Sequence, residues 1–167
     1  WSRHSRELAG QFTGEHTKPI ADLVIDVESP FFLHSCSADK TVLTFDLSRN
    51  RRLTLHASTS KSQNRAFTCL TQKLTGEREL ITGSSDGNLS FWDIDYRDAV
   101  DQIFGSSSET QSINGVDISP KDGRFLSSVG DDGLLNLWDV SKEKNVKLVA
   151  QGQVHSSPIR AVRWSPD

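Results

Sequence analysis

The stretch that decides the fold is residues 86–93, which read DGNLSFWD and return as DGLLNLWD at residues 132–139. A third copy, DKTVLTFD at residues 39–46, keeps the aromatic residue and the aspartate in its last two places. The successive aromatic residues of the register are 44, 47 and 46 residues apart, and they are Trp1, Phe45, Trp92 and Trp138. This spacing is close to the roughly 40–45 residues of a four-stranded unit that repeats around a ring.

Other columns of the repeat hold one residue type each. Six residues before the aromatic residue is an aspartate in a predicted turn: Asp39, Asp86 and Asp132. Ten residues before it is a hydroxyl side chain: Ser35, Thr82 and Ser128. Asp-Gly dipeptides precede two of the apolar runs, which is typical of a tight hairpin turn between strands. Lys40 replaces this glycine in the first copy, so we expect a different or strained turn there.

These columns predict an all-β fold, a partial β-propeller with about three full four-stranded blades and parts of two flanking blades. The predicted blades are 1–12 (the end of one blade), 13–56, 57–104, 105–152 and 153–167 (the start of another). In the third full blade we expect strands near 113–118, 124–130, 134–140 and 146–151. Because stacked repeats bury their apolar faces against one another, we expect the parent protein to be longer at both ends.

The composition excludes several classes of function. A net charge of -3 argues against a general nucleic-acid-binding protein, because such a protein needs a basic face. The chain has no apolar run of about 18 residues, the length that a membrane-spanning helix needs. The two cysteines, Cys36 and Cys69, stand alone in apparent strands, so we expect neither a zinc site nor a disulfide framework. A reduced, cytosolic compartment fits this pattern.

The acidic and histidine residues also follow the repeat. Asp46, Asp93 and Asp139 recur once per copy, whereas a catalytic pair would not share the period of a fold. His16 and His155 occupy equivalent places on different blades, with no second histidine or cysteine expected beside them. We therefore expect a protein that is not an enzyme, with no catalytic residue, metal site, cofactor or small-molecule substrate.

At these columns the sequence resembles the WD40 repeat family over nearly its whole length. The resemblance implies a polar relay in each blade from a histidine to a hydroxyl, an aspartate and a tryptophan N–H. The histidine column holds His16, Gln63, Glu109 and His155. The blade of His16 has Phe45, which has no N–H to donate, and the blades of Trp92 and Trp138 have no histidine. No blade therefore has a complete relay, and apolar packing must contribute more to stability. The residues assigned to structural blade positions are His16, Ser35, Asp39, Phe45, Thr82, Asp86, Trp92, Ser128, Asp132, Trp138 and His155.

Three segments carry a closer likeness, residues 45–52, 112–118 and 155–160. They are similar to the later blades of WD-repeat proteins associated with cilia and flagella. This likeness implies a cytoplasmic, cytoskeletal location in the axoneme of a cilium or flagellum. It also implies contacts with tubulin and other proteins of the inner wall of doublet microtubules.

A small basic cluster, Arg49, Arg51 and Arg52, follows the third strand of the first full repeat. One interpretation is a contact with an acidic partner such as tubulin, because arginine pairs well with carboxylates; the other is an ordinary solvated loop. We expect a non-catalytic scaffold that binds proteins, without nucleic-acid or membrane partners. The alternative is an adaptor that reads peptides or phosphopeptides in a cytosolic or nuclear complex, which needs a basic or aromatic pocket at the rim of the central channel.

Overall fold

The computed structural model describes residues 10–57, 66–73, 79–94, 102–105, 111–142 and 146–166, with 102–105 described by their backbone alone. All regular elements in these ranges are strands, so the predicted all-β class is confirmed. Across the same ranges the structure contains no helix able to span a membrane. Of the blade end predicted over residues 1–12, residues 1–9 lie outside the described residues, and residues 10–12 are not in a strand.

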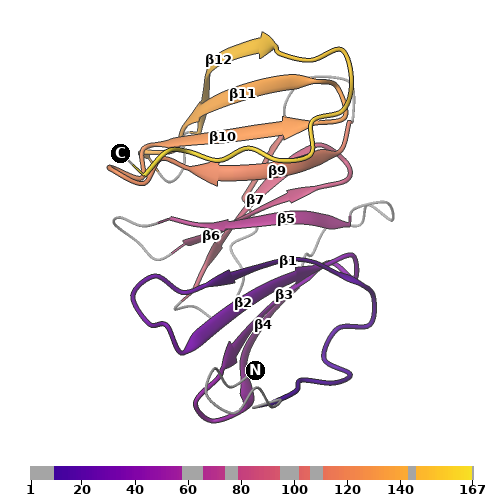
Figure 1. Ribbon diagram of the computed structural model, residues 1–167, viewed down its shortest axis with the longest axis vertical. Helices are drawn as coiled ribbons and strands as arrows, with labels where there is room; N and C mark the ends of the chain where they lie inside the picture. The colour runs from indigo at the N-terminus through magenta and orange to yellow at the C-terminus, as the bar shows by residue number, and fades with distance from the viewer. Residues whose placement is uncertain are drawn as a thin grey trace.

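Twelve strands form three antiparallel sheets, each with its strands in chain order (Figure 1). The first sheet contains β1 (Ile20–Ile25), β2 (Phe32–Ser37), β3 (Thr41–Asp46) and β4 (Arg51–Ala57). The second contains β5 (Phe67–Gln72), β6 (Glu79–Ser84), β7 (Asn88–Asp93) and β8 (Gln102–Gly105). The third contains β9 (Ile113–Ile118), β10 (Phe125–Gly130), β11 (Leu134–Asp139) and β12 (Lys147–Gln153). The four strands expected in this third unit are confirmed, while the blade boundaries stay a prediction.

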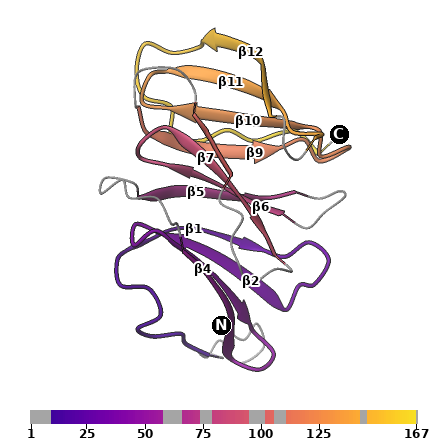
Figure 2. The ribbon, with the colours of Figure 1, turned by 180° about the vertical axis from the view of Figure 1, so that it is seen from behind.

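The first strand of each sheet lies on the inside of the assembly. β1 contacts β5 and β5 contacts β9, while the first and third sheets diverge toward β4 and β12 (Figures 1 and 2). The segment 159–164 runs along the free side of β9, where Trp164 N donates to Asp117 Oδ2 at 2.6 Å. Its first residue is held at the end of β10, where Ile159 N donates to Gly130 O at 2.9 Å. A Cβ atom on Gly115 would lie only 3.1 Å from Ala161 Cα, so glycine permits this close approach. The chain therefore places a fourth inner segment beside the three inner strands.

Apolar side chains fill both interfaces between sheets. The cluster between the first and second sheets comprises Cys36, Val42, Phe67, Leu70, Leu80, Trp92 and Ile94. The cluster between the second and third comprises Cys69, Ile81, Leu89, Phe91, Ile113, Val116, Ile118, Leu126, Trp138 and Val140. Neighbouring residues such as Phe91 and Trp92 enter opposite clusters, because side chains alternate across a strand. Each inner sheet face is thus stabilised by the sheet beside it.

The β2–β3 turn shows what Lys40 does in place of glycine. Lys40 has φ of 71°, close to the 78° of Gly87 and the 72° of Gly133 in the corresponding turns. The hydrogen bond of the turn is also retained, with Lys40 N donating to Ser37 O at 3.2 Å. A side chain with a Cβ atom is strained at positive φ. The turn keeps its shape with a lysine in the left-handed region, so it is not a different turn, and its strain stays a prediction.

Candidate functional site

The first sheet contains the histidine half of the polar relay. His16 Nε2 and Ser35 Oγ share a hydrogen bond of 2.7 Å, and His16 Nδ1 lies 3.1 Å from Asp39 Oδ2. Burial raises the pKa of Asp39, but hydrogen bonds from Thr41, Thr17 N and His16 outweigh it and lower the pKa overall. The order serine, histidine, aspartate resembles a hydrolase triad. Because Ser35 is fully buried, these contacts fasten the loop before β1 to the sheet.

The second and third sheets contain the tryptophan half instead. Trp92 Nε1 donates to Thr82 Oγ1 at 2.9 Å, and Trp138 Nε1 donates to Ser128 Oγ at the same distance. Phe45 has no such donor, and its ring lies 4.5 Å from that of Phe12. The histidine-column residues Gln63 and Glu109 lie outside the described residues.

The remaining structural positions lie at the turns. The turn aspartates Asp86 and Asp132 accept hydrogen bonds from Ser84 Oγ and from Leu134 N. His155 is exposed, and its backbone N donates to Gly133 O at 3.2 Å. These contacts are local to the turns and bring together no group of reactive side chains.

Both cysteines are buried in apolar surroundings. Cys36 lies in the cluster between the first and second sheets, and Cys69 lies in the other cluster. Burial raises the pKa of both thiols, to about 12 for Cys69. Within the described ranges, no group of three or more potential metal ligands comes together.

The basic cluster lies at and just after the turn between β3 and β4. The Arg49 side chain is 68% exposed, and its ion pair with Asp46 is long at 3.7 Å. Arg52 instead forms a 2.7 Å ion pair with Glu15, while Arg51 is exposed on the outer strand. Arg52 therefore has a close partner within the chain, whereas Arg49 has only the long ion pair and a mostly exposed side chain.

Exposed apolar side chains that the sequence did not predict lie at the same end of the first sheet as Arg49. Leu47 N donates to Phe31 O at 2.8 Å, which joins the β3–β4 turn to the β1–β2 turn. Phe31 and Val27 are each 59% exposed, and Leu47 is 42% exposed. We call Val27, Phe31, Leu47 and Arg49 the end patch. An aromatic residue directly after Pro30 in a turn was the sequence signal for it, because nothing in a turn requires an exposed phenylalanine.

The four inner segments enclose a polar cavity of about 220 Å³ near the start of β1, β5 and β9. The polar and charged side chains that line it are Asp22, Thr68, Asn114, Arg160 and Arg163. Arg163 Nη1 donates to Val162 O at 2.9 Å, and Arg160 lies 3.5 Å from the Asp131 carboxylate. The cavity therefore holds two arginines and one carboxylate, Asp22, and both guanidinium groups already have partners in the chain.

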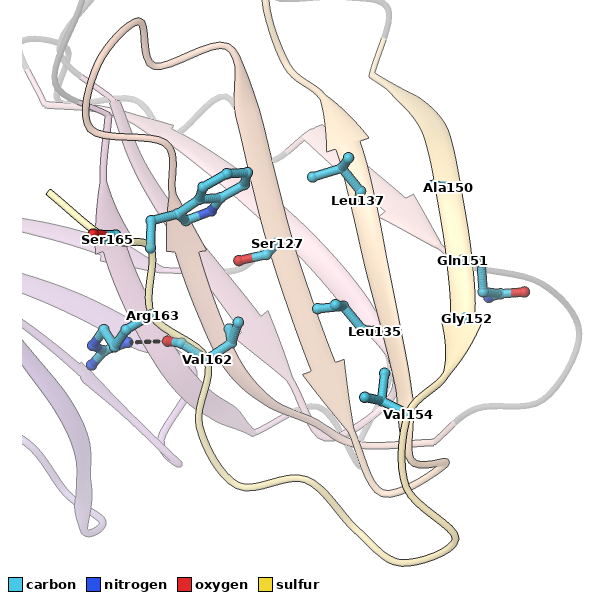
Figure 3. Close-up of a pocket in the computed structure, with 11 residues that line it drawn as sticks. Ser127, Leu135, Leu137, Ala150, Gln151, Gly152, Val154, Val162, Arg163 and Ser165 are labelled. Carbon is cyan, nitrogen blue, oxygen red and sulfur yellow. Dashed lines mark hydrogen bonds between the residues drawn. The ribbon is translucent and has the colours of Figure 1, made fainter. Parts of the chain in front are cut away.

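A groove of about 550 Å³ opens on the third sheet (Figure 3). Leu135 and Leu137 of β11 line one side of it and Val162 lines the other (Figure 3). Trp164 also lines the groove. In the second sheet the equivalent residues of Leu135 and Leu137 are buried under the third sheet. The free face of the first sheet is likewise apolar, with Ile20, Leu23 and Ile25 more than half exposed. Both outer faces therefore have the character of an interface between sheets.

Comparison with known proteins agrees with this architecture. The family model described as "WD domain, G-beta repeat" matches residues 101–139. A guanine nucleotide-binding protein subunit beta-like protein of Encephalitozoon cuniculi is 30% identical over 57% of this chain and 31% of its own length. Nuclear distribution protein PAC1 of Arthroderma otae is 31% identical over 84% of this chain and 31% of its own length.

A third relative, anaphase-promoting complex subunit cdc20 of Dictyostelium discoideum, is 31% identical over 52% of this chain and 17% of its own length. The chain thus spans less than a third of each of these relatives. The match to the repeat model, these relatives and the three four-stranded sheets support the WD40 repeat family, and the fold of this chain is a partial WD40 β-propeller.

Proposed function

We propose that this chain is part of a non-catalytic scaffold of the ciliary or flagellar axoneme that binds tubulin and neighbouring inner-wall proteins. The general part of this proposal, binding to other proteins, is supported by relatives whose names describe subunits of larger assemblies. The axonemal part rests on the resemblance of residues 45–52, 112–118 and 155–160. The names of the relatives given above do not refer to cilia.

The observation that carries the proposal is the exposed Arg49 on a turn that is held by Asp46. Asp46 Oδ1 accepts hydrogen bonds from Ser48 N at 3.0 Å and from Arg49 N at 3.1 Å, which fixes the backbone of the turn. A fixed turn loses little conformational entropy when its side chains bind a partner. Arginine on such a turn is suited to carboxylates on an acidic protein surface.

Co-sedimentation of the full-length parent with axonemal doublet microtubules tests this function. We expect the parent to remain with the doublets after detergent extraction of cilia. Exchanging Arg49 and Arg51 for glutamate should release it into the soluble fraction. Complete solubility of the unaltered parent in detergent-extracted cilia would refute the axonemal role.

A second candidate function is the reading of peptides or phosphopeptides by the polar cavity of Arg160 and Arg163. The observation that favours it is the presence of two guanidinium groups among the inner segments, because arginine binds phosphate groups in a bidentate manner. A pull-down from lysate before and after phosphatase treatment tests it. Loss of partners after the treatment, and with Arg160→Ala, would favour this function over the scaffold.

A further inference from the structure

The end patch crosses the whole width of the first sheet. Val27 follows β1, Phe31 precedes β2, Leu47 follows β3 and Arg49 precedes β4, so the four residues are arranged in the order of the strands. Neighbouring strands are about 4.8 Å apart, so the row spans roughly 14 Å. An extended segment of roughly four or five residues covers that distance. The patch is therefore the right size for a short linear segment.

Buried aspartates hold both turns of the end patch. In the β1–β2 turn, Asp26 Oδ1 accepts hydrogen bonds from Glu28 N at 2.9 Å and Ser29 N at 2.8 Å. Gln72 of the second sheet accepts a hydrogen bond from Val27 N at 3.0 Å. Asp46 has the corresponding role in the β3–β4 turn. The exposed apolar side chains thus lie on a preorganised backbone, a condition that favours binding.

The inner end of the patch opens into a second cavity, of about 270 Å³. Val27 lines it together with Ile118, Pro120 and Trp164, which come from the third sheet and the C-terminal segment. Most of its lining is apolar, although Thr71, Gln72 and Asp117 also line it. The Asp117 carboxylate accepts a hydrogen bond from Trp164 N. The cavity has room for one large apolar side chain beside the central axis.

The charges give the row a direction. The cationic side chains Arg49 and Arg51 are exposed at its outer end, where Asp46 is occupied by its own turn. At the inner end, the acidic residue Glu28 is exposed next to Val27, so the two ends of the row differ in charge. An incoming segment is therefore stabilised with its acidic residues toward β4 and its apolar residue toward the axis.

We propose that the end patch and the cavity beside it bind one extended protein segment, with a large apolar residue in the cavity and acidic residues on Arg49 and Arg51. This inference rests on the proposed scaffold function and adds the chemistry of the partner. Exposed aromatic and arginine residues around an apolar centre are the composition of binding hot spots.

Peptide binding to the full-length parent tests the inference directly. The probe is an N-acetyl hexapeptide of two leucines followed by four glutamates, titrated while tryptophan fluorescence is recorded, because Trp164 lines the cavity. Two control peptides replace the glutamates by glutamines or the leucines by serines. We expect binding of the first peptide that weakens with added salt, and at least about tenfold weaker binding of each control.

Substitutions then locate the site. Exchanging Arg49 and Arg51 for glutamate should abolish binding of the glutamate peptide and permit binding of a peptide with four lysines instead. Phe31→Ser should weaken binding about tenfold, and Lys18→Glu, an exposed cation at the opposite end of the first sheet, should have no effect. Equal binding of all three peptides, or unchanged binding after the arginine exchange, would overturn the inference. Failure of the parent to sediment with doublets would refute the axonemal role and leave this binding intact, so the two failures are distinguishable.

Discussion

Trp92 of β7 reaches diagonally to Thr82 of β6 in the buried middle of the second sheet, where the indole N–H donates to the threonine hydroxyl at 2.9 Å. Both residues are completely buried, so neither polar group can find water when the bond is absent. The third sheet repeats the pair with Trp138 and Ser128. This bond joins the third strand of a sheet to the second. We expect it to contribute to stability in sheets that lack the histidine of the relay.

The first prediction concerns this bond. Thr82→Val should destabilise the chain by about 1–3 kcal/mol, because it leaves the indole N–H buried without an acceptor. Trp92→Phe should lower the free energy of unfolding by about 2–4 kcal/mol, because it removes the indole N–H and leaves a cavity. Urea unfolding of both single variants and the double variant measures the coupling. A double variant whose loss equals the sum of the two would show that the bond contributes nothing.

The second prediction compares equivalent places in two sheets. Leu89 is fully buried between the second and third sheets, whereas Leu135 is 36% exposed in the groove. Leu89→Ala should destabilise the chain by about 2–4 kcal/mol, and Leu135→Ala by less than about 1 kcal/mol. Urea unfolding of the two variants provides the comparison. Equal losses would mean that the groove is covered in solution.

The third prediction concerns the turn of Lys40. Lys40→Gly should stabilise the chain by about 1 kcal/mol, because glycine adopts positive φ without strain. Gly87→Ala is the matched control in the second sheet, and its Cβ atom would lie 2.9 Å from Gln111 O. We expect the control to lower the thermal midpoint while the first variant raises it. A lower midpoint for Lys40→Gly would show that the lysine side chain stabilises the turn more than its backbone strains it.

The fourth prediction concerns pH and His56. This imidazole is fully buried beside Trp92, and neither ring nitrogen has a hydrogen-bond partner. Burial lowers its pKa below the ordinary value of 6.5, and Asp93 offsets only part of the shift. The folded state therefore disfavours protonation of His56. The contribution of the neutral imidazole to the free energy of unfolding is fully present above pH 6.5, and it is lost as the pH falls toward the lower pKa of the folded state.

Unfolding free energies at pH 7.5 and pH 5.5 measure this effect. The decrease should be smaller for His56→Leu, which has no group to titrate and removes two unsatisfied polar atoms. An equal decrease in the variant and the unaltered chain would assign the pH dependence to other histidines.

The candidate site was only partly predictable from the sequence. The basic cluster of Arg49, Arg51 and Arg52 stands out because its charges are adjacent in the chain. The sequence does not show that Arg52 is paired, because its partner Glu15 comes from a distant segment of the chain. Phe31 and Leu47 are likewise distant in the chain, and only the pairing of β2 with β3 brings their turns together.

By itself the sequence determined the repeat, and with it the strands and turns, because alternation, turn residues and the aromatic–aspartate column are local properties of the chain. Only the tertiary structure decided which side chains lie between sheets and which remain exposed. Identical columns have different surroundings here, as Leu89 and Leu135 show. The reason is that burial depends on a neighbouring sheet about 46 residues away along the chain, and no local pattern specifies whether that neighbour is in place.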